Sequence, residues 1–210
     1  MRITYLFDPL CGWCYGAAPA LDGLTQLGDV TLELMPTGLF AGEGARAMND
    51  QFAAYAWQND QRIARLTGQP FSEAYRTEVL GGRGGMFDSA PATLGVIAVR
   101  VTEPARELDA LKALQRARYV DGRDNVSLAG VSDILESIGL PAAAERVRTP
   151  DEQLMQDYRR SIDAAQLDMR RFGISGVPAM LVGEGASRHL LPGNLLFGRF
   201  DLLVSQLKAA

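Results

Sequence analysis

The stretch LCGWCYG fills residues 10–16 and holds the only two cysteines of the 210-residue chain, Cys11 and Cys14. Two residues, Gly12 and Trp13, separate them. This spacing fits a redox pair, half of a metal site, or two core residues that happen to be neighbours. The sequence around the cysteines and the rest of the chain distinguish these three interpretations.

The cysteines lie where a strand is expected to turn into a helix. Residues 2–7 (RITYLF) are rich in β-branched and aromatic side chains, which predicts a short buried strand. Apolar residues then recur every three or four positions, which predicts one helix that starts at Cys11 and ends before Gly28. Apolar and polar residues alternate in residues 30–35 (VTLELM), which predicts a second strand. The opening of the chain is therefore predicted to be a β-α-β unit.

The middle of the chain, residues 41–149, shows almost no β pattern. Its predicted helices cover residues 45–66, 72–80, 90–101, 104–119, 128–138 and 141–147. Residues 81–85 are read as a loop, since they lack the Lys-Ser/Thr of a phosphate-binding P-loop.

The end of the chain returns to a mixed pattern. A helix capped by Thr149 is expected to end at Gly173, followed by strands at 177–182 and 188–191 and a helix at 200–207. We therefore expect an α/β fold in which strands from both ends of the chain form one sheet. One domain would comprise residues 1–40 and 150–210, and an all-helical insertion domain would comprise residues 41–149.

Composition narrows the classes of function. Hydrophobic residues make up 47% and charged residues 22%, as in an ordinary globular protein. The net charge of -4 gives no basic surface for nucleic acid or for an acidic membrane. No apolar run is long enough for a transmembrane helix, and no leader pattern precedes the first strand. A cytoplasmic location is expected, where a lone cysteine pair is more often catalytic or metal-binding than structural.

The chemistry of the pair follows from its place at the start of a helix. A thiolate is the attacking species in thiol–disulfide exchange, and the positive end of the helix dipole favours negative charge on Cys11. Cys14 lies one turn further and faces inward, so Cys11 is predicted to attack and Cys14 to resolve. Zinc needs about four ligands, and the chain offers two cysteines and the single His189. A redox pair without metal or organic cofactor is favoured over a shared zinc site or two inert core cysteines.

A second motif, Ser175-Gly176-Val177-Pro178-Ala179, opens a predicted strand with a proline. Together with the first motif it resembles the thioredoxin fold, and more closely the DsbA-related oxidoreductases with an all-helical insertion, including the FrnE-like proteins. The resemblance spans nearly the whole chain. It rests on residues 8–16, on residues 115–117 with 122–124, on residues 172–178, and on Pro19 as the helix-kinking proline.

The resemblance implies roles for several residues. Pro178 would be a cis-proline that shields the thiols from metals and shapes the substrate groove, and Val177 would offer backbone groups to an extended substrate. Gly12 and Trp13 would tune the redox properties of Cys11. The relatives commonly have proline in place of Gly12, and the periplasmic oxidant among them has a histidine between its cysteines that this chain lacks.

A buried acid is also expected near the resolving thiol. Thioredoxins place it in the first strand, where this chain has Tyr5. Asp8 is the candidate for proton transfer here, with a turn residue before Pro9 as the alternative interpretation.

The predicted activity is thiol–disulfide oxidoreduction, with a protein or a small disulfide or thiol such as glutathione as substrate. The alternative is a glutathione-dependent transferase or isomerase, resembling the kappa-class and hydroxychromene-carboxylate isomerase relatives of this fold. Those enzymes use a single Ser or Cys, so the presence of Cys14 argues against them. A third possibility is a partner-binding adaptor that does not use Cys11. The direction of electron flow and the oligomeric state are left open.

The remaining polar residues and the 86–89 segment carry less specific signals. The sole histidine, His189, is expected to be structural. Arg116, Arg118 and Arg123 are expected on a solvated face, with attraction of glutathione carboxylates by an arginine near the cleft as the alternative. Residues 86–89 are expected either to pack in the core or on the surface, or to line a groove facing Cys11.

Overall fold

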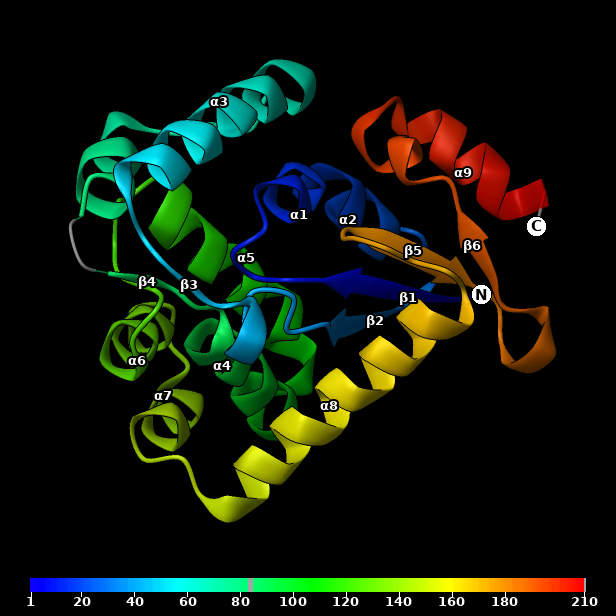
Figure 1. Ribbon diagram of the computed structural model, residues 1–210. Coiled ribbons are helices and arrows are strands. Elements are labelled where there is room, and N and C mark those ends of the chain that lie inside the picture. Colours follow the sequence, from blue (N-terminus) through cyan, green and yellow to red (C-terminus); the bar gives the residue numbers. More distant parts are fainter. Residues whose placement is uncertain (83–84, 210) are drawn as a thin grey trace.

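A four-stranded mixed sheet forms the centre of the computed structural model, which describes residues 1–82 and 85–209 (Figure 1). The strands are β1 (Arg2–Phe7), β2 (Thr31–Pro36), β5 (Ala179–Val182) and β6 (His189–Leu191). Their order is β2-β1-β5-β6, with β1 parallel to β2 and antiparallel to β5, and β5 antiparallel to β6. Strands from both ends of the chain thus share one sheet, and the predicted α/β thioredoxin-like fold is confirmed.

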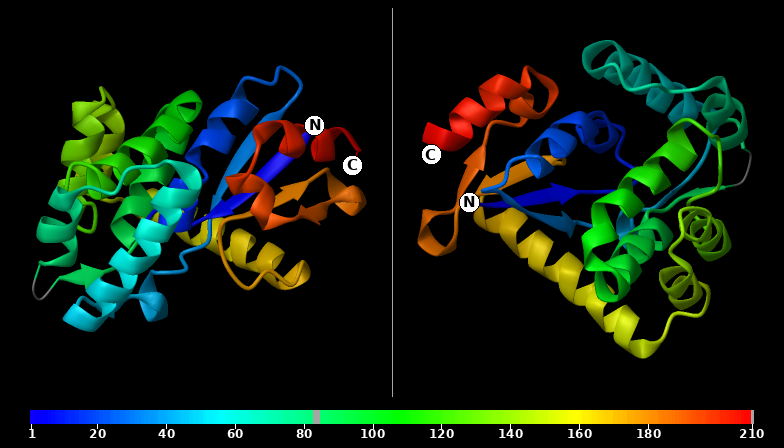
Figure 2. Two further views of the ribbon diagram at one scale, coloured as in Figure 1. Left: turned by 90° about the horizontal axis from the view of Figure 1, so that it is seen from above. Right: turned by 180° about the vertical axis from the view of Figure 1, so that it is seen from behind.

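Helices cover both faces of this sheet (Figures 1 and 2). The helices on one face are α1 (Gly12–Gly16), α2 (Ala18–Thr25) and α9 (Phe200–Ala209), and α8 (Glu152–Arg171) lies on the other. Successive side chains of β1 point to opposite faces of the sheet, so this strand packs against the helices on both sides. Tyr5 and Phe7 join the buried cluster of α1, α2 and α9, whereas Leu6 packs with Ala165 of α8.

The middle segment is mainly helical, as predicted. Its elements are β3 (Arg46–Ala47), α3 (Asp50–Thr67), the π-helix η2 (Tyr75–Leu80), β4 (Met86–Phe87), α4 (Ala90–Thr102), α5 (Glu107–Tyr119), α6 (Leu128–Ser137) and α7 (Pro141–Arg148). Short 3-10 helices are η1 (Gly42–Gly44), η3 (Pro104–Arg106), η4 (Gly185–Ser187) and η5 (Gly193–Phe197). The short antiparallel pair β3–β4 was not predicted. The domain limits at residues 41 and 149 stay a prediction.

Three of the differences from the predicted helix boundaries have a clear local cause. The helix expected from residue 11 to 27 is broken at Ala17, because Pro19 has no N–H to continue the helical hydrogen bonds. The helix expected from residue 45 begins at Asp50, since the Asn49 side chain accepts from the Phe52 N–H at 2.8 Å. Asp151, not Thr149, caps α8, and its carboxylate accepts from the Leu154 N–H at 2.7 Å.

Within residues 1–82 and 85–209, none of the helices has the length and apolar character needed to cross a membrane. Residues 83 and 84, in the predicted glycine-rich loop, lie outside the described residues.

Candidate active site

Cys11 occupies the N-cap position of α1, directly after the loop that follows β1. Its Sγ accepts a hydrogen bond from the Cys14 N–H at 3.4 Å, and it lies 3.5 Å from the Val177 carbonyl oxygen. The start of a helix presents unpaired N–H groups and partial positive charge, both of which favour an anion on this sulfur. Cys11 also lines an open pocket, so a substrate can reach it.

Cys14 is enclosed behind Cys11. Its side chain is 1% exposed, and the structure shows both cysteines as free thiols. Burial raises the pKa of the Cys14 thiol well above its usual range, and the hydrogen bond and negative charge of Cys11 act in the same direction. The two sulfurs therefore differ: one faces a pocket at a helix start, and the other stays protonated in the core.

The predicted proline loop lies against the first of these sulfurs. The Val177–Pro178 peptide bond is cis, and the carbonyl of Val177 is the group that accepts from Cys11 Sγ. Trp13 extends the same surface, with its ring edge-on to Phe197 at a centroid distance of 5.0 Å. The structure thus brings together Cys11, Trp13, Val177 and Pro178, which the sequence separates by more than half of the chain.

Asp8 is buried beside the cysteine loop. One carboxylate oxygen accepts from the Leu10 N–H at 2.9 Å, and the other accepts from the Phe40 N–H at 3.0 Å and the Ser89 hydroxyl at 2.7 Å. Burial raises the pKa of this carboxyl, and the three hydrogen bonds oppose the rise. Asp8 has two opposite effects on the pKa of Cys14: its backbone hydrogen bond lowers this pKa, and its negative charge raises it by less.

Tyr5, which stands where thioredoxins have an acid, donates from its hydroxyl to the Cys14 carbonyl at 3.3 Å. Tyr5 therefore holds the backbone of α1 in place. Because Tyr5 has no carboxyl group, Asp8 is the acid that lies beside the cysteine loop. The role of Asp8 in proton transfer stays a prediction.

The pocket in front of Cys11 has a volume of about 270 Å³ and lies between α1 and α3. Its lining includes Cys11, Gly12, Trp13, the aromatic residues Phe40, Phe52, Tyr55 and Phe87, and Asp60. Helix α3 approaches α1 closely because two glycines leave room for it. A Cβ on Gly12 would lie 2.5 Å from Asp60 Oδ1, and one on Gly16 would lie 2.7 Å from Ile63 Cγ2.

Asp60 is the site residue that the sequence analysis missed. Its side chain is only 5% exposed, and its Oδ2 accepts from the Tyr75 hydroxyl at 2.8 Å. Burial raises its pKa to about 7, against the opposing effects of the Tyr75 hydrogen bond and the positive charge of Arg118. A polar residue on an amphipathic helix reads as solvent-facing, so the α3 sequence alone contains no signal for its burial.

The prediction of a solvated face for Arg116, Arg118 and Arg123 is wrong for Arg118. This side chain is 2% exposed, and its guanidinium lies within 5.8 Å of the ring centroids of Tyr75, Phe87 and Tyr119. Cation–π attraction and a hydrogen bond to Asn125 Oδ1 at 3.3 Å hold it there. Its charge therefore acts on the aromatic wall of the pocket and on Asp60.

Residues 86–89 were expected to line a groove facing Cys11 or to pack in the core or on the surface, and the four residues differ: Met86 is exposed, whereas Phe87 and Ser89 are buried. Phe87 lines the pocket, and the buried Ser89 bonds to Asp8. His189 lies in the edge strand β6, where its Nδ1 is 3.1 Å from the Ser187 carbonyl oxygen, and it does not line the pocket.

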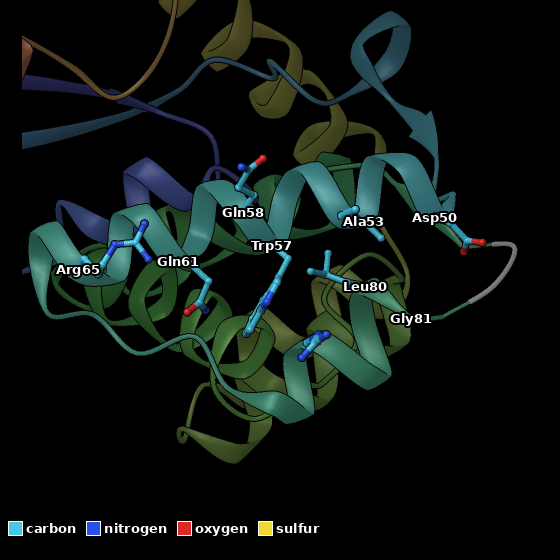
Figure 3. A pocket seen from close by; sticks show the side chains of 10 residues that line it. Asp50, Ala53, Trp57, Gln58, Gln61, Arg65, Leu80 and Gly81 are labelled. Atoms are coloured by element: carbon cyan, nitrogen blue, oxygen red, sulfur yellow. The ribbon is translucent and has the colours of Figure 1, made fainter.

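A second hollow, of about 490 Å³, lies between α3 and η2 (Figure 3). Trp57 and Leu80 contribute its apolar wall, and the guanidinium of Arg76 lies 5.3 Å from the Trp57 ring centroid. Neither cysteine lines it. Helix α3 and η2 contribute to both pockets, but only the smaller one contains Cys11, so we assign the chemistry to it.

Comparisons with known proteins agree with this geometry. The family model of the DSBA-like thioredoxin domain matches residues 2–208. The cytosolic disulfide reductase DsbM from Pseudomonas aeruginosa is 29% identical over 100% of both chains, with a TM-score of 0.86. Its structure with GSH matches at 29% identity over 99% of this chain and 100% of that chain, with a TM-score of 0.83.

Other comparisons are less close. A protein from Nitrosomonas europaea is 27% identical over 99% of this chain and 98% of that chain, with a TM-score of 0.77. A 2-hydroxychromene-2-carboxylate isomerase has a TM-score of 0.66 at 18% identity over 100% and 95% of the two chains, which shows the fold alone. A search of curated proteins finds no match. Because the family model matches nearly the whole chain, the chain belongs to the DSBA-like thioredoxin domain family and is an enzyme of the thiol–disulfide oxidoreductase class.

Proposed function

We propose that this protein reduces disulfides with the Cys11–Cys14 pair, Cys11 attacking and Cys14 resolving. The asymmetry of the two sulfurs is the observation that carries the proposal. Cys11 is hydrogen-bonded by the Cys14 N–H at a helix start and lines the pocket, whereas Cys14 is enclosed and has a raised pKa. Nucleophile and resolving thiol need these two environments.

The reaction has two exchange steps. The Cys11 thiolate attacks one sulfur of the substrate disulfide, forms a mixed disulfide with it and expels the other sulfur as a thiolate. Cys14 then loses its proton and attacks Cys11, which releases the second substrate thiol and leaves the Cys11–Cys14 disulfide. The substrate has gained two electrons and the enzyme has lost two, so an external thiol must reduce the enzyme for the next cycle.

The pocket favours a small disulfide as substrate. Helix α3 covers Cys11, and the pocket volume of about 270 Å³ suits a small thiol compound better than a folded protein surface. Exposed Arg46 at its edge offers a positive charge for carboxylates, as in glutathione. The 29% identity to a disulfide reductase whose structure contains GSH supports reduction rather than oxidation, and glutathione as substrate or reductant.

The residues around the pair would assist. Pro178 and Val177 would hold the substrate backbone beside Cys11, Gly12 and Trp13 would tune the redox potential, and Asp8 would take the proton of Cys14. The similarity to a cytosolic reductase of Pseudomonas aeruginosa supports a cytoplasmic location for this protein.

A glutathione-dependent isomerase is the alternative reading. The fold it requires is present, since a 2-hydroxychromene-2-carboxylate isomerase shares it. However, a monothiol mechanism does not need a second cysteine directly behind the first, so the position of Cys14 favours the oxidoreductase.

A glutathione redox titration of the purified protein tests the proposal. We expect Cys11 and Cys14 to interconvert as one two-electron couple with a potential near about -270 mV, as in reducing thioredoxins, rather than about -120 mV, as in periplasmic oxidants. Cys14→Ala should accumulate a mixed disulfide with glutathione on Cys11, and Cys11→Ala should accumulate none. A stable glutathione adduct in the wild-type protein, with no internal disulfide, would instead support the isomerase.

A further inference from the structure

Asp60 presents a free carboxyl oxygen to the pocket of Cys11. Its Oδ1 lies over Gly12, where even a methyl group would approach it to 2.5 Å, and both residues line the pocket with Cys11. Its Oδ2 is fixed by the Tyr75 hydroxyl. In the part of the chain that the structure describes, Oδ1 receives no hydrogen bond and the carboxylate forms no ion pair.

The charged and titratable groups around Asp60 come from four elements. Tyr75 faces it from η2, Arg118 and Tyr119 from α5, Cys11 from the start of α1, and Arg46 lines the pocket from β3. The hydrogen bond from Tyr75 and the positive charge of Arg118 both favour the ionised form of Asp60. Burial outweighs these effects and raises the pKa of Asp60 to about 7, so both protonation states exist near neutral pH.

We propose that Asp60 is a catalytic residue that donates a proton to the thiolate expelled when Cys11 attacks a small disulfide. This inference rests on the proposed function. As the bond from Cys11 to the first substrate sulfur forms, the second sulfur leaves with the electron pair of the broken S–S bond. The proton of the Asp60 carboxyl passes to that sulfur, which departs as a neutral thiol, and the Asp60 carboxylate recovers a proton from water.

Asp60 suits this role better than Asp8 does. Three donors occupy both oxygens of Asp8, and Asp8 does not line the pocket. Asp60 has one oxygen held in place and one directed toward the space that a substrate would fill. A general acid whose pKa is near the working pH is the most effective, because it is both populated as the acid and able to release the proton.

The test uses the full-length protein with Cys14→Ala, so that only the first exchange step is observed. The rate of thiol release is measured from pH 5 to pH 9 with bis(2-hydroxyethyl) disulfide, which carries no charge, and with glutathione disulfide. Asp60→Asn is compared with Asp60 intact, and Asp50→Asn serves as the control, since it makes the same change on the same helix outside the pocket.

At pH 6 we expect Asp60→Asn to slow release of both thiols by on the order of tenfold or more, and the difference to vanish as the pH rises well above 7. Tyr75→Phe should move the midpoint of that pH dependence upward, because the Tyr75 hydrogen bond lowers the pKa of Asp60. Asp50→Asn should change neither.

The inference would be overturned if the ratio between the thiol-release rates with Asp60 intact and with Asp60→Asn did not change with pH. A higher KM for glutathione disulfide alone would also overturn it, since that result would assign Asp60 to binding the substrate ammonium group. The proposed function fails separately, if thiol release persists in Cys11→Ala.

Discussion

Replacement of Asp60 by asparagine is expected to stabilise the folded protein at neutral and alkaline pH. Asparagine has nearly the same shape, and its carbonyl oxygen can still accept from the Tyr75 hydroxyl in the place of Oδ2. The new amide NH₂ then takes the place of Oδ1, on the pocket side. The substitution therefore removes a charge that is 5% exposed and preserves the contacts of the side chain.

The size of the effect follows from linkage between proton binding and folding. The pKa of Asp60 is about 7 in the folded protein and close to its ordinary value of 3.8 in the unfolded chain. Each pKa unit corresponds to about 1.4 kcal/mol, so ionised Asp60 costs the folded state about 4 kcal/mol above pH 7. The folded state holds this proton more tightly, so its advantage is fully present below about pH 4 and is lost as the pH rises through 7.

Urea unfolding at pH 4 to 9 measures the stability cost of ionised Asp60 directly. The difference in unfolding free energy between Asp60→Asn and the wild type should be about 0.6 kcal/mol at pH 4 and about 1.7 kcal/mol at pH 5. It should level off at about 4 kcal/mol above pH 7. Asp50→Asn should show no such rise. A difference that does not grow with pH, or an asparagine variant that is less stable at pH 8, would refute the assignment of a buried, proton-holding carboxyl to this position.

Three further predictions concern the supports of the site. Gly12→Ala should destabilise the protein by about 1–3 kcal/mol at pH 7, because its Cβ displaces Asp60 from Tyr75. In a double-mutant cycle, the same Gly12→Ala change should cost much less stability when Asp60 is already replaced by alanine. Ser89→Ala removes a hydrogen-bond donor to Asp8 and should lower the free energy of unfolding by about 1.5–3 kcal/mol at pH 8. The loss should be smaller at pH 4, because the raised pKa of Asp8 favours its uncharged form there. Equal losses at the two pH values would contradict this. Asn49→Ala should lower the stability measured by thermal or urea unfolding by about 1 kcal/mol, because α3 loses its N-cap hydrogen bond. Asn49→Ser should retain most of the wild-type stability, since serine can also cap the helix.

Local patterns in the sequence were sufficient for the architecture around the thiols. The β-branched and aromatic residues of the first strand, the alternation in residues 30–35 and the period of three to four after Cys11 are all local signals, so they predict the β-α-β opening without knowledge of the fold. The spacing of the cysteines and the Val177-Pro178 motif then identified the family by resemblance. These signals are local, and the Asn49 and Asp151 caps show their limit: several capping residues lie near each helix start, and only the path of the chain selects one.

The tertiary structure alone decided which polar residues of the middle segment reach the thiols. Asp60 and Arg118 lie on helices whose sequences allow either a solvated or a buried position for them. Their burial follows from the close approach of α3 to Gly12 and Gly16 and from the aromatic side chains that enclose the Arg118 guanidinium. Because such contacts join residues far apart in the chain, and because burial rather than residue type sets the pKa of a carboxyl, the second acid of this site becomes visible only in the folded molecule.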